Sequence, residues 1–512
     1  MHSKTPSYIP GILLLAILLI AGFLTYQDYG ISWDEAAQQE LGKVTYEYAF
    51  HKNDFIKTID DRRLGTGFEL PLTIIERNVN CKSERDIFLC RHLVTHIFFL
   101  LGAFCMYVLA LKVFKKQLLG ILAFIMVALE PRMYAHSFMN TKDIPFLTSF
   151  IFVMLACYIA FNNRKPLSYL VAGIAVGYAC AIRGMGMLFV MLIAIALLID
   201  IITNLKDRQQ LLKQLLNTSL WGIGFCGMLY LSWPMLWETP VHTFKESFLS
   251  LAGIPWSGEV LFNGKMYGGN ALPWNYMPVW LSISIPELWV VSGYAGIVLL
   301  LIAFVKKPVA HITNTPDRHF VFYLACFLAP PVAMHIFHGA NIDDWRHLYF
   351  IYPPFVMLGL YTINKAVEHG KQLSVILLST AQLALLLIFM ISSHPNQQVY
   401  FNYFVSHDKE YLRKHYDYDY WCCSFTQGVA EIAARDPSPV IKIAGIRATL
   451  INAMKMLSPE DAKRIQFVQK EENPDYFLTV FRMHPDDYEY KNVFYEIKSQ
   501  NSTVMRIYKL KP

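Results

Sequence analysis

The sequence predicts a polytopic α-helical membrane protein with about eleven transmembrane helices, interfacial helices in the first outer loop, and a small C-terminal α/β domain. Of the 512 residues, 54% are hydrophobic and 16% are charged, whereas soluble domains are about 45–50% apolar and about 25% charged. The apolar residues form runs of about 20, the length that a helix needs to cross a bilayer core of about 30 Å. This composition excludes a disordered chain and a disulfide-dense secreted scaffold.

About eleven apolar runs are candidates for membrane-spanning helices. The third run is the weakest, because Glu130 and Arg132 interrupt it. The first run lacks a small-residue cleavage site and is followed by further spans, so we do not interpret it as a cleaved signal peptide. The predicted spans are 9–26, 87–113, 117–135, 143–161, 166–182, 187–203, 214–234, 285–305, 319–338, 347–363 and 373–391.

The basic residues predict the orientation of the chain, because short loops rich in Lys and Arg gather on the cytoplasmic side. Lys4 precedes the first span, and every second gap that follows is basic. We therefore expect a cytoplasmic N-terminus, with large outer loops at about 27–86 and 235–284. The net charge of +6, spread in short tufts between apolar runs, argues against a nucleic-acid partner.

The polar end of the chain predicts a small α/β domain over 392–512, next to a membrane domain over 1–391. Ser424 can cap a helix over about 425–435, and a second helix is expected at about 447–456. Short β-branched and aromatic runs predict strands. These strands are Val440–Ala444, Arg464–Val468, Tyr476–Phe481, Val493–Ile497 and Val504–Tyr508.

Two adjacent carboxylates, Asp34 and Glu35, open the first outer loop a few residues after the first span. The stretch to His51 is predicted to form an amphipathic helix at the membrane interface. Two carboxylates in this position are candidates for catalysis. The alternative is a simple helix start, with Ser32 as the cap and both acids favoured by the helix dipole. The apolar face of this helix is predicted to hold Ala37, Leu41, Val44, Tyr48 and Phe50.

A second acidic position, Asp143, follows Lys142 at the start of the fourth predicted span. It can act as a second carboxylate near the first outer loop, with Lys142 as a neighbouring cation. The alternative is that Thr141 or Asp143 merely caps the helix, with Pro145 in its first turn. Both interpretations stay open from the sequence.

Cations stand at the outer ends of several spans. Arg183 lies between two apolar runs, and Arg346 and His347 begin the tenth predicted span. Ionisable residues at such depth are costly and usually face a pocket or a partner, and a guanidinium is well suited to bind phosphate. The alternative is an arginine that reaches to the interface or pairs with Asp343 or Asp344.

A divalent metal site is a weaker candidate. His335, His338 and Asp343 are ligand types grouped in one outer loop, although such groupings also arise by chance. The sequence contains no phosphate-binding P-loop, dinucleotide-binding glycine pattern, Gly-x-Ser-x-Gly elbow or His-Glu-x-x-His motif. It therefore predicts no certain cofactor.

Together these features resemble the GT-C class of integral-membrane glycosyltransferases, in the branch of protein O-mannosyltransferases and bacterial aminoarabinose transferases. The resemblance covers about residues 5–390 and depends on the order and sidedness of several short motifs. The matching motifs are Trp33-Asp34-Glu35, Phe68-Glu69-Leu70, His136 through Pro145, and Arg346-His347-Leu348 leading into Tyr352-Pro353-Pro354.

The resemblance implies a polyprenyl-phosphate-sugar donor and inverting transfer at the outer membrane face. It places the family's acid pair on Asp34 and Glu35, its second acidic position on Asp143, and its late phosphate-binding residue on Arg346. The chemistry needs a base for the acceptor hydroxyl and cations for the departing phosphate. We predict Asp34 as the base, with Glu35 or Asp143 orienting the acceptor. The predicted phosphate-binding residues are Arg346, Arg183, Lys142, His347 and Arg132.

The acceptor is predicted only as a glycan, a lipid or a protein. The C-terminal domain is not the β-trefoil of the eukaryotic mannosyltransferases, which argues against a protein acceptor. The lack of that domain and of a retention signal favours a bacterial inner membrane. A lipid or solute transporter is the main alternative function, but it predicts inverted repeats and ionisable groups near the bilayer midplane. A membrane assembly subunit is a further alternative that leaves the acid pair without a role.

Overall fold

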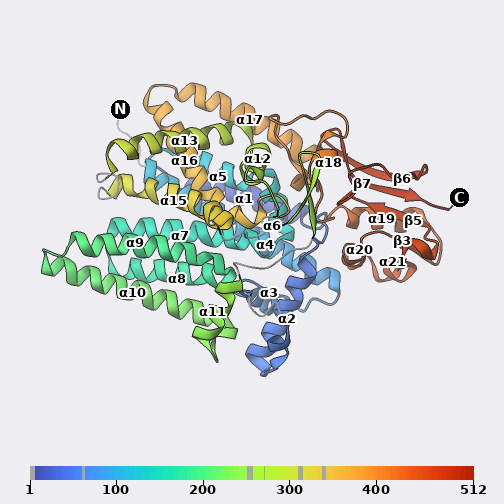
Figure 1. Ribbon diagram of the computed structural model, residues 1–512, viewed down its shortest axis with the longest axis horizontal. Helices are drawn as coiled ribbons and strands as arrows, with labels where there is room; N and C mark the ends of the chain where they lie inside the picture. The colour runs from blue at the N-terminus through green and yellow to red at the C-terminus, as the bar shows by residue number, and fades with distance from the viewer. Residues whose placement is uncertain are drawn as a thin grey trace.

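The computed structural model describes residues 6–59, 64–250, 258–269, 271–308, 315–336 and 342–511. A bundle of long helices makes up most of the molecule, and a twisted β-sheet with short helices lies at one end of it (Figure 1). The two chain termini lie toward opposite ends of the longest axis (Figure 1). The fold class is therefore mostly helical with a small C-terminal sheet, as predicted.

A helix occupies each predicted membrane span. The helices are α1 (Ile9–Thr25), α4 (Glu84–Phe114), α5 (Gln117–Ala128), α7 (Asp143–Asn163), α8 (Pro166–Ile182), α9 (Met187–Thr203), α10 (Arg208–Ser232), α13 (Glu287–Lys306), α15 (Thr315–Ile336), α16 (Tyr352–Glu368) and α17 (Gln372–Ser392). Among the described residues, six helices are long and apolar enough to cross a membrane, or seven if one bent pair counts as a span. The architecture is that of a multi-pass membrane protein, whereas the count of eleven spans stays a prediction.

Two predicted spans differ in their course. The third is broken: α5 ends, Glu130 accepts a hydrogen bond from the N–H of Met133, and α6 (Pro131–Met139) continues at an angle of 57°. The tenth span begins later than predicted. Arg346–Ile351 forms a 3₁₀ helix, η5, and α16 starts at Tyr352, where two prolines fit its first turn.

The loops that the sequence predicts to be outer carry short helices and one hairpin. The predicted amphipathic helix is α2 (Glu35–His51), which buries Leu41, Val44 and Tyr48 against the protein, while Ala37 and Phe50 are exposed. The other outer elements are η1 (Asp54–Thr58), α3 (Glu69–Asn78), η3 (Gly184–Gly186), η4 (Pro234–Leu236), α11 (Pro240–Ser250), β1 (Glu259–Phe262), β2 (Lys265–Gly268) and α12 (Tyr276–Ser284).

The C-terminal part contains every predicted strand and both predicted helices. Its sheet has the order β4-β3-β5-β7-β6, in which β3 pairs parallel to β4 and β5, and β7 pairs antiparallel to β5 and β6. The strands are β3 (Ile441–Ala444), β4 (Ile465–Phe467), β5 (Tyr476–Thr479), β6 (Val493–Ser499) and β7 (Ser502–Lys509). The helices are η6 (Gln397–Val399), α18 (Tyr411–His415), α19 (Phe425–Arg435), α20 (Arg447–Met454), α21 (Pro459–Arg464) and η7 (Lys470–Glu472).

Two details of this region follow from packing. Ser424 does not cap α19 as predicted; its hydroxyl donates to Asp419, which also accepts from the backbone N–H of Ser424. Phe401 and Tyr416 belong to the core of the helical bundle, and a separate core begins at Cys422. The stretch before the sheet thus packs on the bundle, while the division at residue 391 stays a prediction.

Helices α8 and α10 are in backbone contact through glycines. A Cβ atom on Gly173 would lie 2.0 Å from the carbonyl oxygen of Trp221, and one on Gly224 would lie 2.4 Å from that of Leu170. Small residues allow this close approach, which stabilises helix pairs in membranes through van der Waals packing. The approach leaves no room for a methyl group at either position.

We predict that Gly173→Ala lowers the stability of the purified protein by about 1–3 kcal/mol, the usual cost of overpacking. The measurement is thermal unfolding in detergent. Gly227→Ala is the matched control, because Gly227 lies on α10 with nothing within 4 Å of an added Cβ. Equal melting temperatures for the two variants would contradict the close approach.

Candidate active site

Four chain segments bring charged residues together at one end of the bundle. Asp34 precedes α2, Asp143 begins α7, Arg183 follows α8, and Arg346 begins η5. Nη1 of Arg346 lies 3.3 Å from Oδ2 of Asp34 and 3.4 Å from Oδ2 of Asp143, and Nη2 lies 3.1 Å from Oδ2 of Asp343. One guanidinium is therefore shared among three carboxylates from three parts of the sequence.

Arg346 is held as a permanent cation. Burial alone would lower the pKa of Arg346, but the adjacent carboxylates of Asp34, Asp343 and Asp143 outweigh burial and raise this pKa above its usual range. The guanidinium carbon also lies 4.8 Å from the ring centre of Trp421. Nε of Arg346 is buried without a hydrogen-bond partner. The residue thus offers fixed positive charge and one unused donor.

Arg183 forms the second cationic part of the cluster. It pairs with Asp143, and its Nη2 lies 3.0 Å from Nδ1 of His347. Burial lowers the pKa of Arg183, and Asp143 opposes that shift. Burial, together with Arg346 and Arg183, lowers the pKa of His347 well below its usual range. His347 is therefore neutral and accepts a hydrogen bond from Arg183, so it orients a cation rather than supplying one.

The two carboxylates nearest Arg346 differ in exposure. The side chain of Asp34 is 42% exposed, whereas that of Asp143 is 2% exposed. Asp143 is held by Arg183 and Arg346, and it accepts a hydrogen bond of 3.0 Å from Nδ2 of Asn140. Asp34 is consequently the carboxylate that an acceptor can reach, and Asp143 is a fixed charge behind it.

Buried hydrogen bonds and an ion pair hold the segment that carries Asp143. Oδ1 of Asn140 accepts from the backbone N–H groups of Lys142 and Asp143, so Asn140 performs the capping that was predicted for Thr141 or Asp143. Thr141 instead donates to Glu69, which pairs with Arg91 in the bundle interior. The Phe68-Glu69-Leu70 motif thus acts by supporting the cluster. Lys142 is half-buried at this helix start.

Glu35 and Arg132 do not lie at the cluster, which corrects their predicted roles. Oε1 of Glu35 lies 3.0 Å from Nε2 of His92 inside the bundle, because adjacent helical residues point about 100° apart. Nη1 of Arg132 lies 3.1 Å from Oδ2 of Asp344, and both side chains are fully buried. Each of these two side chains therefore pairs with another buried side chain and not with the cluster.

In the part of the chain that it describes, the structure does not bring the predicted metal ligands together. His335 is exposed at the end of α15, and Asp343 pairs with Arg346 through one oxygen and with Arg482 through the other. His338 lies outside the described residues. Within the described ranges, no three His, Cys, Asp or Glu side chains form a candidate metal site.

Several residues of the site were not predicted. The hydroxyl of Tyr420 donates to Oδ2 of Asp344 over 2.8 Å and lies 3.1 Å from Nε2 of His136. Burial raises the pKa of Asp344 to about 6, and Arg132 opposes the shift. Tyr420 lies in an aromatic-acidic run, Asp417 to Trp421, which is a sequence signal that could have indicated this part of the site. Arg482 had no such signal.

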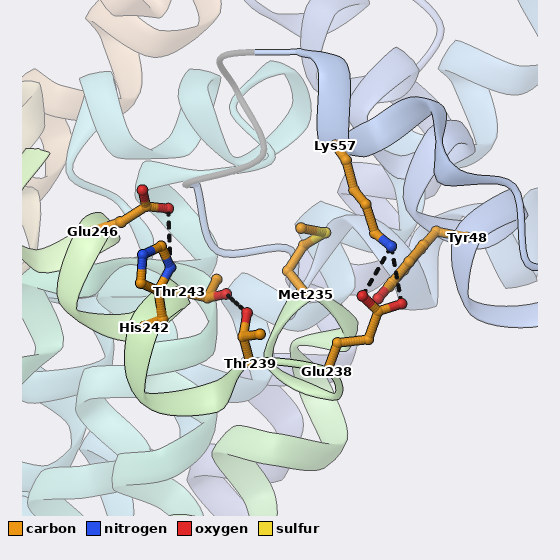
Figure 2. Close-up of a pocket in the computed structure, with 8 residues that line it drawn as sticks. All are labelled: Tyr48, Lys57, Met235, Glu238, Thr239, His242, Thr243 and Glu246. Atoms are coloured by element: carbon orange, nitrogen blue, oxygen red, sulfur yellow. Dashed lines mark hydrogen bonds and ion pairs between the residues drawn. The ribbon is translucent and has the colours of Figure 1, made fainter.

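A cavity of about 220 Å³ lies away from the cluster (Figure 2). It is lined by Tyr48, about 20 Å along α2 from Asp34 at 1.5 Å per residue, and by residues of η1, η4 and α11. Figure 2 shows Lys57 directed at Glu238, with Nζ 2.8 and 2.9 Å from the two carboxylate oxygens. This ion pair joins two loops that lie far apart in the sequence, and none of the predicted site residues lines the cavity.

Comparison with known proteins gives a family match and a fold match. A family model described as dolichyl-phosphate-mannose-protein mannosyltransferase matches residues 82–229. The structure of ArnT from Cupriavidus metallidurans in the apo state matches with a TM-score of 0.50 and 12% identity, over 97% of each chain. The chain has the fold of a GT-C glycosyltransferase. Together, the partial family match and this shared fold confirm the resemblance predicted from the sequence.

Two further structures are less similar. ArnT bound to undecaprenyl phosphate matches with a TM-score of 0.48 and 10% identity over 97% of each chain. An oligosaccharyltransferase of Archaeoglobus fulgidus matches with a TM-score of 0.42 and 12% identity, over 81% of this chain and 57% of that chain. The present chain thus spans little more than half of the archaeal enzyme. No curated protein sequence matches significantly.

We predict that Glu35→Gln lowers thermal stability but keeps turnover per folded molecule within about tenfold of the wild type, because Glu35 contacts His92 rather than the cluster. Turnover is measured on the monodisperse fraction, alongside a melting curve. A loss of turnover as large as that of an Asp34 variant, without a change in stability, would return Glu35 to a catalytic role.

Proposed function

We propose that this protein is a glycosyltransferase that moves a sugar from a polyprenyl-phosphate donor to an acceptor at the outer membrane face, with inversion. The observation that carries this proposal is the exposed carboxylate of Asp34 next to Arg346 and Arg183. A base and a pair of cations within one cluster match the two requirements of transfer from a phosphodiester.

The donor phosphate is proposed to bind Arg346 and Arg183. A phosphate accepts two parallel hydrogen bonds from a guanidinium, which lysine cannot offer. Of the carboxylates on Arg346, Asp34 is the most exposed and Asp143 and Asp343 are buried. An incoming phosphate therefore displaces Asp34 most readily, and this displacement leaves its carboxylate free for the acceptor.

The proposed reaction balances with these groups. The acceptor hydroxyl oxygen attacks C1 of the sugar and passes its proton to Asp34. The bond from C1 to the phosphate oxygen breaks, and the polyprenyl phosphate leaves with one more negative charge, which Arg346 and Arg183 stabilise. A phosphate is a good leaving group, so no general acid is needed. Attack opposite to the departing phosphate inverts the configuration at C1.

The proposed location is the inner membrane of a bacterium, with a cytoplasmic N-terminus and the C-terminal domain on the outer side. The opposite positions of the two termini support this orientation (Figure 1). The prenyl chain and the surrounding bilayer lipids are the proposed lipid partners, and the acceptor is a glycan, lipid or protein. A transporter is less well supported, because Asp143, Arg183 and Arg346 lie at helix ends.

We predict that Asp34→Asn lowers transfer by about 10²–10⁴-fold, the usual contribution of a general base. The measurement is turnover of a panel of labelled polyprenyl-phosphate sugars by the purified protein in lipid. Even without an acceptor, slow hydrolysis of the donor releases prenyl phosphate. Glu40→Gln is the matched control, because Glu40 is an exposed acid on α2 that pairs with Lys43.

The outcomes separate the alternatives. Turnover that vanishes in Asp34→Asn and persists in Glu40→Gln supports the proposal and identifies the sugar. Wild-type turnover by Asp34→Asn contradicts the assignment of the base. No turnover and no binding across the panel contradicts the donor class, and flux assays in vesicles would then test transport.

A further inference from the structure

One residue of the C-terminal domain reaches the charged cluster. The side chain of Arg482 is 7% exposed, and its Nη2 lies 2.7 Å from Oδ1 of Asp343. Its Nη1 donates to the carbonyl oxygen of Tyr420, and its guanidinium carbon lies 5.2 Å from the ring centre of Trp33, directly before Asp34. Arg482 therefore contacts both the segment of the proposed base and the partner of Arg346.

The backbone around this contact is unusual on both sides. Phe481 and Met483, which flank Arg482, have φ angles of 59° and 56°, and Asp343 and Asp344 have φ angles of 57° and 60°. Residues with a Cβ atom adopt this left-handed region in only a few per cent of cases. Such outliers persist where the surrounding structure fixes them and are frequent at functional sites. Here they occur at both ends of the ion pair between Arg482 and Asp343.

The C-terminal domain also holds the segment that carries Asp34. Nδ2 of Asn452 on α20 donates to the carbonyl oxygens of Ser32 and Trp33 over 3.2 and 3.3 Å. A Cβ atom on Gly30 would lie 2.2 Å from the carbonyl oxygen of Cys423, so the two segments are in backbone contact. The domain thus forms one wall of the candidate site.

We infer that Arg482 is a positioning residue, which neutralises Asp343 so that Arg346 stays available to the phosphate of the lipid donor. This inference rests on the proposed function. Asp343 divides its two oxygens, Oδ1 to Arg482 and Oδ2 to Arg346. When a phosphate takes the place of Asp34 on Arg346, the buried Asp343 carboxylate stays paired with Arg482 and so does not repel the incoming anion.

The charge balance of the cluster supports the same role. The arginines 183, 346 and 482 are matched by Asp34, Asp143 and Asp343. Loss of Arg482 removes one positive charge from the cluster and leaves Asp343 paired with Arg346 alone, so the cluster attracts an incoming phosphate less strongly. Loss of Arg482 is therefore expected to weaken phosphate binding first.

The test measures the Kd of undecaprenyl phosphate for the full-length protein in lipid nanodiscs. We expect Arg482→Gln to raise this Kd by about tenfold or more, and Arg482→Lys, which keeps the charge, to stay within about threefold of the wild type. Arg506→Gln is the matched control, because Arg506 pairs with Glu496 and Asp487 in the same domain. The control is expected to bind as the wild type does.

A double-mutant cycle with Asp343→Asn separates positioning from general damage to the fold. If Arg482 acts through Asp343, then adding Arg482→Gln to Asp343→Asn changes Kd by less than about twofold. This comparison also covers the case in which Arg482→Gln alone does not fold, because the double variant then carries no unpaired Asp343.

The remaining results overturn the inference. A wild-type Kd in Arg482→Gln, an equal loss in Arg506→Gln or Arg482→Lys, or an undiminished loss in the Asp343→Asn background each contradicts positioning through Asp343. Failure of the wild-type protein to bind undecaprenyl phosphate contradicts the proposed function as well, so the two failures are distinguishable.

Discussion

The guanidinium of Arg346, shared among Asp34, Asp143 and Asp343, is the interaction on which the candidate site depends. Burying charges is costly unless they are paired and hydrogen-bonded. Here the pairing joins the segment before α2, the start of α7 and the segment before α16. Removal of the shared cation would leave three carboxylates facing one another, so these segments are held in place by their common partner.

The surrounding structure fixes two of these carboxylates and leaves the third accessible. Asp143 is fixed by Arg183 and Asn140, and Asp343 is fixed by Arg482. Asp34 is half-exposed and pairs with Arg346 on the accessible side of the cluster. An anion that binds Arg346 therefore competes mainly with Asp34. In the proposed reaction this competition links donor binding to release of the base.

Much of the fold could be predicted from the sequence, because it follows from apolar run length and strand patterning. Asp34, Asp143, Arg183 and Arg346 were named as candidates from their positions at the ends of predicted spans and from the family resemblance, and the structure brings them together. Glu35 was misassigned because adjacency in sequence does not fix which way a helical side chain points.

The other differences arise from tertiary contacts. Arg132 pairs with Asp344, a residue more than 200 positions away that only the tertiary structure brings near. The contact of Arg482 with Asp343 could not be predicted, because it depends on how the C-terminal part of the chain packs against the bundle. Neither composition nor periodicity describes that packing. The sequence indicated charged residues near the ends of the predicted spans, and the tertiary structure determines which of them share a site.

The most direct test of the central claim compares the binding of undecaprenyl phosphate with that of uncharged undecaprenol, for the wild type and for Arg346→Gln. If Arg346 is the phosphate ligand, the wild type prefers the phosphate by about tenfold or more, and Arg346→Gln loses that preference while its affinity for undecaprenol is unchanged. Equal preference for the phosphate in both proteins would contradict the account.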